Sequence, residues 1–462
     1  MNLLEILQLI SKKLQKINII HIIFTSFSIH MFVISHPNFE VLDEVFFTTF
    51  MRWFMLGIDH SPYQLPGLSF IVSPFVYVFG DNWASWRFPI VIFGMVFLYF
   101  SNKVIEQVST KKIAIITSII MAFSPVIFVS SSLMLRDMPV MAIGFFSIYL
   151  YFKQKYYFAA LLIGLSALIK ETAIFFVMFI VIYHVLNNKE ELIIAVKNIS
   201  TYGFKFIKTP LIFLLIMAAS FLIPLAIYDN TITVLEYSTR YPEYFAVNEN
   251  FEPGVMRFDI LRSTTEIYQK PVEQFNYVSQ VTDPIHHLQV IFTKGYYTQQ
   301  EVATNEFIAS FLPIPSGKTV HNITYGYDKT YIDEEGIERH QKEYSTLWVQ
   351  SIINYTWWHF GFWSCIILMG YTIFQRIKNK IQIPKDITFI FSGFVFFVPY
   401  LIIDALRDTF AYYMIYFLPV MGVGLTTIIY KIPNKTIRFL MFAAFLLAII
   451  SNFLYIFPMW GF

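Results

Sequence analysis

Four of the charged doublets in this chain lie beside apolar segments and have side chains of the types that handle phosphate groups. Arginine and lysine bind phosphate through charge-assisted hydrogen bonds, and a carboxylate can act as general base toward a hydroxyl nucleophile. If the doublets meet in one cleft, they predict transfer of a group from a lipid phosphate to a hydroxyl acceptor. The doublets are Asp43-Glu44, Arg136-Asp137, Lys170-Glu171 and Arg407-Asp408.

Each doublet also has a simpler interpretation, because charged residues routinely flank membrane spans. Three of the doublets, those that begin at Arg136, Lys170 and Arg407, are equally consistent with helix ends at the membrane surface. Asp43-Glu44 favours function more strongly, since it sits among apolar residues of a predicted surface helix, where a charge is dispensable.

The composition places these residues in a membrane protein. Of 462 residues, 56% are hydrophobic and only 14% are charged, whereas a soluble domain averages about 25% charged residues. This composition argues against a water-soluble enzyme, a disordered protein and a nucleic-acid-binding protein. The single cysteine, Cys365, permits no intrachain disulfide.

About eleven apolar segments could form membrane-spanning helices. A helix needs about 20 apolar residues to cross a hydrocarbon core about 30 Å thick. The predicted fold class is therefore an all-α polytopic membrane protein. The eleven segments are residues 17–35, 87–101, 113–133, 138–152, 156–169, 172–187, 210–228, 352–374, 387–404, 409–430 and 438–457.

The loop charges predict the orientation of these segments. With the N-terminus in the cytoplasm, the short loops on that side are rich in lysine and arginine, as the positive-inside rule requires. The stretch 229–350, with 17 acidic and nine basic residues, then falls outside. The four doublets collect at outer ends of spans, and the span interiors carry almost no ionisable group, which argues against a transporter.

Three domains are expected. Residues 1–228 form an N-terminal transmembrane module, whose first outer loop, 36–86, contains an aromatic run that predicts helices lying on the outer face. Residues 229–350 form a small α+β or β-rich extracytoplasmic domain, because a β-prone run at 330–332 precedes a turn and a second run. Residues 351–462 form the C-terminal transmembrane helices.

The doublets belong to a longer ordered series of motifs. The series is Leu42-Asp43-Glu44, His60-Ser61-Pro62, Phe79-Gly80, Arg87-Phe88-Pro89, Gly94, Arg136-Asp137-Met138-Pro139, Gly164, Ile169-Lys170, Arg407, Tyr412-Tyr413 and Pro419. The order of these motifs, their spacing and their common side of the membrane resemble those of the GT-C superfamily, whose members are integral-membrane glycosyltransferases that use polyprenyl-phosphate sugars. The likeness is closest to the protein O-mannosyltransferase and aminoarabinose-transferase group. The family's His-Pro-Pro element is matched imperfectly, and residues 229–350 show no trefoil repeats like those of the eukaryotic members.

The resemblance implies an inverting glycosyltransferase with its active site on the extracytoplasmic side. Asp43 would take the proton from the acceptor hydroxyl, and Glu44 would orient Asp43 or the acceptor. Arg136, Lys170 and Arg407 would bind the donor phosphate. The supporting residues would be Asp137, Glu171, Asp408, Tyr412 and His60.

The expected partners follow from the same resemblance. They are a polyprenyl (dolichyl)-phosphate sugar as donor, a protein, lipid or glycan as acceptor, and membrane lipids, with no nucleic acid. No cofactor is predicted, because the outer loops contain no Asp-x-Asp motif for a divalent metal and His286-His287 lacks the usual spacing of zinc ligands. A divalent metal stays open as an alternative without support from the sequence.

Two other functions stay open. A ligase or polymerase of lipid-linked glycans would use similar donor chemistry with a diphosphate leaving group, and a non-catalytic lipid or solute transporter would move its substrate without covalent transfer. We expect a multi-pass protein of the plasma membrane, because abundant Ile, Lys, Asn and Phe are typical of an AT-rich prokaryotic genome. The endoplasmic reticulum membrane is the alternative.

Overall fold

The computed structural model describes most of residues 17–234 and 355–455 and short stretches between them. The described residues are 17–35, 44–55, 58–59, 65–190, 194, 199–231, 233–234, 325–332, 338–345, 355–380, 382–404 and 411–455. Four residues of the predicted site lie outside these ranges, namely Asp43, His60, Arg407 and Asp408. Most of the predicted extracytoplasmic domain, 229–350, also lies outside them.

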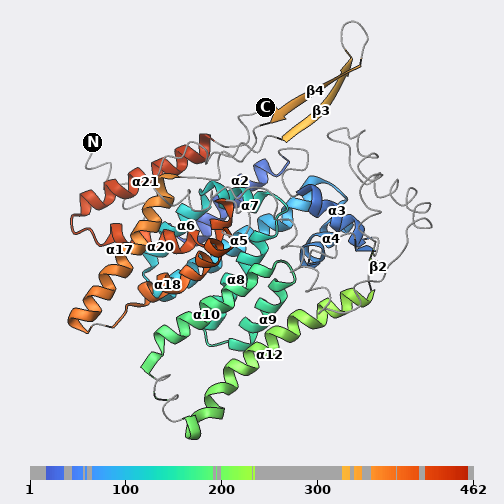
Figure 1. Ribbon diagram of the computed structural model, residues 1–462. Coiled ribbons are helices and arrows are strands. Elements are labelled where there is room, and N and C mark those ends of the chain that lie inside the picture. Colours follow the sequence, from blue (N-terminus) through green and yellow to red (C-terminus); the bar gives the residue numbers. More distant parts are fainter. Residues whose placement is uncertain are drawn as a thin grey trace.

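The described chain is mostly helical, which confirms the coarse prediction of an all-α architecture (Figure 1). The N-terminal elements are α2 (Ile19–Val33), α3 (Glu44–Met55), α4 (Gly67–Phe79), α5 (Trp83–Val108), α6 (Lys111–Ala122), α7 (Pro125–Ser132), α8 (Asp137–Phe152), α9 (Tyr156–Ala167), the 3-10 helix η1 (Glu171–Ala173), α10 (Ile174–Asn187) and α12 (Ile199–Thr231). The C-terminal elements are α17 (Tyr355–Asn379), α18 (Lys385–Gly393), η4 (Phe394–Phe396), α19 (Val398–Asp404), η5 (Ala411–Tyr416), α20 (Leu418–Tyr430) and α21 (Lys435–Tyr455).

Short polar side chains set where several of these helices begin. Asn82 accepts a hydrogen bond from the backbone N–H of Ser85 at the start of α5, and Thr110 does the same for Ile113 at the start of α6. Such N-caps satisfy backbone donors that have no partner within the helix. Pro125, which lacks an N–H, is the first residue of α7.

The segment 113–133, predicted as a single span, is instead two helices. α6 and α7 meet at an angle of 65°, and proline at the start of α7 provides the physical reason, because it cannot continue the hydrogen bonds of the preceding helix. The predicted span 387–404 is likewise divided into α18, η4 and α19.

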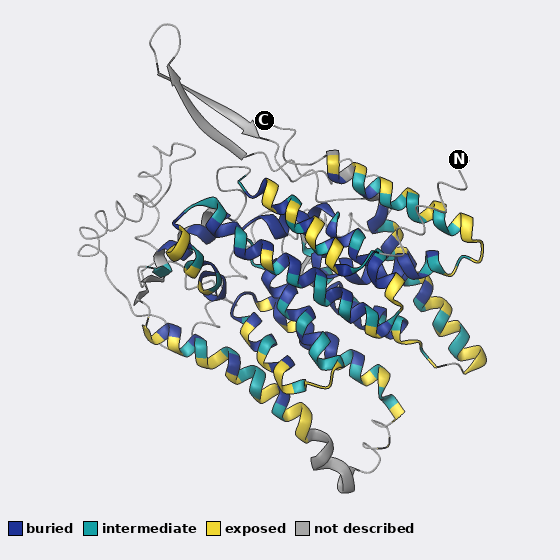
Figure 2. Cartoon of the chain, turned by 180° about the vertical axis from the view of Figure 1, so that it is seen from behind, coloured by how far each residue is buried: buried dark blue, intermediate teal, exposed yellow. Residues whose placement is uncertain are grey.

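The buried core lies along the central helices. α5 packs against α6 and α8, and α20 packs against α6 and α17. Phe97 of α5 and Phe145 of α8 are both fully buried and meet edge to face at 5.4 Å between ring centres. Buried residues concentrate in these helices, whereas α12 and α17 carry many exposed apolar side chains (Figure 2). Apolar faces turned outward on peripheral helices fit a lipid environment.

Among the described residues, three helices are long and apolar enough to cross a membrane, and the bent pair α6 and α7 could add a fourth. The three are Trp83–Val108, Lys208–Thr231 and Trp357–Asn379. Six other apolar helices in the described ranges have 10–17 residues, which is shorter than the 18 residues taken as the minimum for a span. The count of eleven spans therefore stays a prediction.

Two small sheets accompany the helices. β1 (Ile58–Asp59) pairs in parallel with β2 (Thr233–Val234). β3 (Tyr325–Ile332) and β4 (Glu338–Ser345) form an antiparallel hairpin in which Tyr325 pairs with Ser345 (Figure 1). The hairpin lies where the sequence pattern predicts strand, turn and strand, while the fold of the rest of 229–350 lies outside the described residues.

Candidate active site

The first part of the site is the buried carboxylate of Glu44, the first residue of α3. Arg87 of α5 donates from Nε to Oε1 at 2.9 Å and from Nη2 to Oε2 at 2.7 Å. The backbone N–H of Met134 donates to Oε1 at 2.8 Å. Both side chains of the ion pair are completely buried. A carboxylate held by three donors in a dry environment is a fixed anchor, so Glu44 fixes the start of α3.

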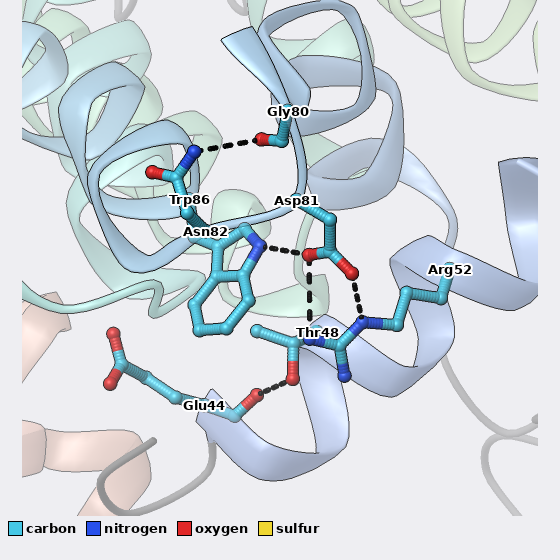
Figure 3. A network of polar contacts seen from close by, with 7 residues as sticks. All are labelled: Glu44, Thr48, Arg52, Gly80, Asp81, Asn82 and Trp86. Carbon is cyan, nitrogen blue, oxygen red and sulfur yellow. Dashed lines mark hydrogen bonds and ion pairs between the residues drawn. The ribbon is translucent and has the colours of Figure 1, made fainter. Parts of the chain in front are cut away.

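A second buried ion pair holds the other end of α3 (Figure 3). Arg52 donates from Nε to Asp81 Oδ2 at 2.7 Å, and the indole Nε1 of Trp86 donates to Asp81 Oδ1 at 2.7 Å. The Arg52 guanidinium carbon also lies 5.0 Å from the centre of the Trp86 ring. One ion pair lies near each end of α3. Together they fix α3 against α5 and against residues 80–82, the turn that precedes α5.

Gly80 and Asn82, on either side of Asp81, determine the conformation of the turn between α4 and α5. Gly80 ends α4 with a φ of 88°, a conformation that glycine adopts readily and other residues rarely do. Asn82 donates to the Gly80 carbonyl at 3.2 Å while its own oxygen caps α5 (Figure 3). This turn therefore sets the direction in which Asp81 reaches α3.

Arg136 directly precedes α8, and its side chain faces α3. The guanidinium carbon lies 5.1 Å from the ring centre of Phe47, one turn after Glu44. The Arg136 Nε is buried and forms no hydrogen bond with any described residue. Leaving a buried donor unpaired costs about 1–3 kcal/mol, and guanidinium groups match phosphate oxygens in paired hydrogen bonds. Arg136 is therefore well suited to bind an anion.

Lys170 belongs to a buried polar network that adjoins Arg136. Its Nζ donates to Asp137 Oδ1 at 2.7 Å. The hydroxyl of Tyr416 donates to the same oxygen at 2.7 Å, and Thr172 Oγ1 lies 2.8 Å from that hydroxyl. Asp137 directly follows Arg136 in the chain, so the ion pair between Asp137 and Lys170 places Lys170 near the start of α8, next to which Arg136 lies.

The structure thus brings together four of the predicted site residues. Glu44 is linked to the segment before α8 through Met134, and that segment leads into Arg136 and the Asp137–Lys170 pair. Glu171 is exposed at the start of η1, and its side chain forms no hydrogen bond or ion pair with the described residues of this network. Tyr412 lies in η5, but its side chain is outside the described part of the chain. The roles assigned to these residues stay predictions.

Several residues of the arrangement carried no predicted role, among them Arg87, Phe47 and Tyr416. Arg87 lies within an apolar run, where a charged residue signals a buried partner, so this signal was available in the sequence. Phe47 and Tyr416 gave no such signal, because each is one aromatic residue among 88. Their positions depend on contacts between parts of the chain that are distant in sequence.

Within the described ranges, no group of three or more His, Cys, Asp or Glu side chains is arranged to hold a metal ion. Two carboxylates of the arrangement are engaged by basic side chains, Glu44 by Arg87 and Asp137 by Lys170.

Two structures of an archaeal enzyme are similar to this chain. The crystal structure of the Archaeoglobus fulgidus oligosaccharyltransferase in the apo form has 11% identity and a TM-score of 0.45. The Archaeoglobus fulgidus oligosaccharyltransferase AglB in complex with an inhibitory peptide and a dolichol-phosphate has 12% identity and the same TM-score. Each similarity covers 96% of this chain and 56% of the other. This chain therefore spans little more than half the length of those structures.

No curated protein matches the chain significantly. The family model described as dolichyl-phosphate-mannose-protein mannosyltransferase matches residues 59–223, which include the Asp81 turn and the segment from Arg136 to Thr172. Over this part, the protein is similar to the dolichyl-phosphate-mannose-protein mannosyltransferases, and the resemblance indicated by its ordered motifs is confirmed.

Proposed function

We propose that this protein is a membrane glycosyltransferase that moves a sugar from a polyprenyl-phosphate donor to a hydroxyl acceptor on the extracytoplasmic side. The observation that carries the proposal is a pair of linked cations. Arg136, whose buried Nε has no hydrogen-bond partner among the described residues, faces Phe47 of α3. Lys170 is bound to Asp137, the residue after Arg136. The two cations can bind the phosphate that leaves, and Arg136 lies against the helix that follows Asp43, the proposed general base.

The proposed reaction is a single displacement. The acceptor oxygen forms a bond to the anomeric carbon of the sugar while Asp43 takes the hydroxyl proton. The bond between the anomeric carbon and the phosphate oxygen breaks, and its electron pair leaves with the polyprenyl phosphate. The configuration at the anomeric carbon is inverted. Arg136, Lys170 and Arg407 stabilise the charge that develops on the phosphate.

The buried ion pairs give Glu44 a positioning task in this proposal. Its carboxylate is engaged by Arg87 and Met134, so it is poorly placed to accept a proton from a substrate. By fixing the first turn of α3, it orients Asp43, the preceding residue. Asp137, held between Lys170 and Tyr416, keeps the lysine extended.

The proposed function also includes a donor, an acceptor and a membrane location. The donor is a polyprenyl or dolichyl phosphate carrying one sugar, and the acceptor is a protein, lipid or glycan hydroxyl. The protein lies in the plasma membrane with a cytoplasmic N-terminus, and about eleven spans cross the bilayer. No cofactor is included in the proposal, and transfer that persists in the presence of a chelator is the expected result.

The test is sugar transfer by purified protein in proteoliposomes, with radiolabelled polyprenyl-phosphate sugars and a panel of peptide, lipid and glycan acceptors. Asp43→Asn should abolish transfer while donor binding persists, and Arg136→Ala should reduce kcat/KM roughly 100-fold. Normal transfer by Asp43→Asn would show that the base is assigned wrongly. Transfer only from oligosaccharide diphosphates would instead identify a glycan ligase, and lipid movement without any covalent product would identify a transporter.

A further inference from the structure

Each of the two cations faces an aromatic ring from a different part of the chain. The Arg136 guanidinium carbon lies 5.1 Å from the centre of the Phe47 ring in α3. The Lys170 Nζ lies 5.4 Å from the centre of the Tyr413 ring in η5. Both distances are within the range in which a cation is attracted to the negative face of a ring.

Both rings are held in place by their own contacts. Phe47 is buried within α3, which two ion pairs fix near its ends. Tyr413 stacks on Tyr400 with 5.2 Å between ring centres and 12° between ring planes, and Phe175 packs edge-on against Tyr400 at 5.5 Å. Arginine and lysine side chains are flexible by comparison, so each ring limits the positions that its cation can take, and Lys170 is also held by Asp137.

A ring face attracts a cation without using its hydrogen-bond donors and without cancelling its charge. This distinction matters at Arg136, whose buried Nε has no hydrogen-bond partner in the described part of the chain. A carboxylate in the position of Phe47 would pair with the guanidinium and compete with an incoming phosphate. The aromatic ring leaves both the positive charge and the N–H groups available.

We propose that Phe47 and Tyr413 are positioning residues that set the affinity for the donor phosphate by holding Arg136 and Lys170 against their ring faces. This inference rests on the proposed function, because it assumes that the two cations bind the phosphate. Phe47 also follows the predicted base, Asp43, by about one helical turn. The same helix therefore supports the acceptor side of the reaction and a cation of the donor side.

The test compares variants that keep or remove each ring. Phe47→Leu and Tyr413→Leu should each raise the KM for the polyprenyl-phosphate sugar, and the Kd for sugar-free polyprenyl phosphate, by about threefold to tenfold. Phe47→Tyr and Tyr413→Phe, which keep the ring face, should stay near the original values. The KM for the acceptor should not change. Phe158→Leu, at an exposed position of α9, is the matched control and should leave all constants unchanged.

A second measurement separates ring electrostatics from packing. Phenylalanines with increasing numbers of ring fluorines, placed at position 47, weaken the negative face with little change of shape. The Kd for polyprenyl phosphate should rise with each fluorine. A flat fluorine series, or Leu variants with normal donor constants, would overturn the inference. If Arg136→Ala still reduces transfer in those circumstances, the proposed function stands; if Arg136→Ala leaves donor binding unchanged too, the phosphate site itself is wrong.

Discussion

At the scale of single residues, adjacent charges in a doublet have different environments. Arg136 keeps a buried nitrogen without a hydrogen bond, whereas the next residue, Asp137, is engaged by Lys170 and Tyr416. Glu44 is likewise engaged by Arg87. Glu44 and Asp137 are therefore held within the protein by ion pairs, and the sequence alone does not distinguish them from Arg136, which keeps a donor without a partner among the described residues.

The Glu44–Arg87 pair permits a prediction about stability. Glu44→Gln should destabilise the protein by about 3–5 kcal/mol, because it leaves the buried Arg87 guanidinium without a counter-charge. Thermal unfolding in detergent measures the change, with the exposed Glu190→Gln as control. Replacing both partners by leucine should recover part of the loss. Equal melting temperatures for Glu44→Gln and Glu190→Gln would contradict an anchoring role for Glu44.

The hydroxyl of Tyr416 permits a second prediction. Tyr416→Phe removes the group that bonds both Asp137 and Thr172, and the loss should cost about 1–3 kcal/mol of stability. Donor KM should rise as well, since Asp137 holds Lys170 less firmly. Tyr157→Phe, at an exposed position, serves as the control. A rise in donor KM without any loss of stability would show that the hydroxyl contacts the donor directly.

At the scale of elements, the close approach of α4 to the end of α9 positions the turn that leads to Lys170. The backbone N–H of Gly67, the first residue of α4, donates to the Leu168 carbonyl at 2.8 Å. A Cβ at position 67 would lie 2.6 Å from the carbonyl carbon and oxygen of Leu168. Backbone atoms cannot give way as a flexible side chain does, so only glycine fits between these elements.

Because of this contact, we expect alanine substitutions at Gly67 and Gly370 to have different effects on stability and on the donor KM. Gly67→Ala should displace α4 from the turn before Lys170, with lower stability and a higher donor KM. Gly370→Ala, in α17, should be neutral or stabilising, because nothing lies within 4 Å of an added Cβ there and alanine favours helix. Both variants are compared by melting temperature and by donor KM. Identical behaviour of the two would mean that the α4–α9 contact is not required.

Several elements could be predicted from the sequence, but their ends and breaks could not. Apolar runs indicate helices reliably, as α5 and α12 show. The break between α6 and α7 was missed because hydropathy continues through Ser124 and Pro125, and only the missing N–H of proline marks it. The site was predicted in part, since charged doublets are visible in the sequence, whereas partners such as Tyr416 depend on tertiary packing.

At the scale of the whole molecule, the candidate site is formed by residues of both the N-terminal and the C-terminal helices. Tyr416 bonds Asp137 across 279 positions of sequence and Thr172 across 244. The part that matches the family model, 59–223, contains neither Tyr416 nor Glu44. The chain therefore completes its candidate site only when the C-terminal helices pack against the N-terminal module.

The orientation of the molecule can be tested by cysteine labelling, because the natural Cys365 is buried. Lys155→Cys and Glu171→Cys each place a thiol at an exposed position near opposite ends of α9. A membrane-impermeant maleimide added to intact cells should label position 171 and spare position 155. Permeabilised cells should be labelled at both. Labelling only at 155 in intact cells would reverse the predicted topology.

The short parallel pair of β1 and β2 has a mechanical consequence. It joins residues 58–59, which come just after α3, to residues 233–234, which come just after α12. A force on the chain beyond residue 234 is therefore transmitted through two backbone pairings to the segment that ends α3. A displacement of residues 233–234 is therefore coupled directly to residues 58–59, which follow the helix that begins at Glu44.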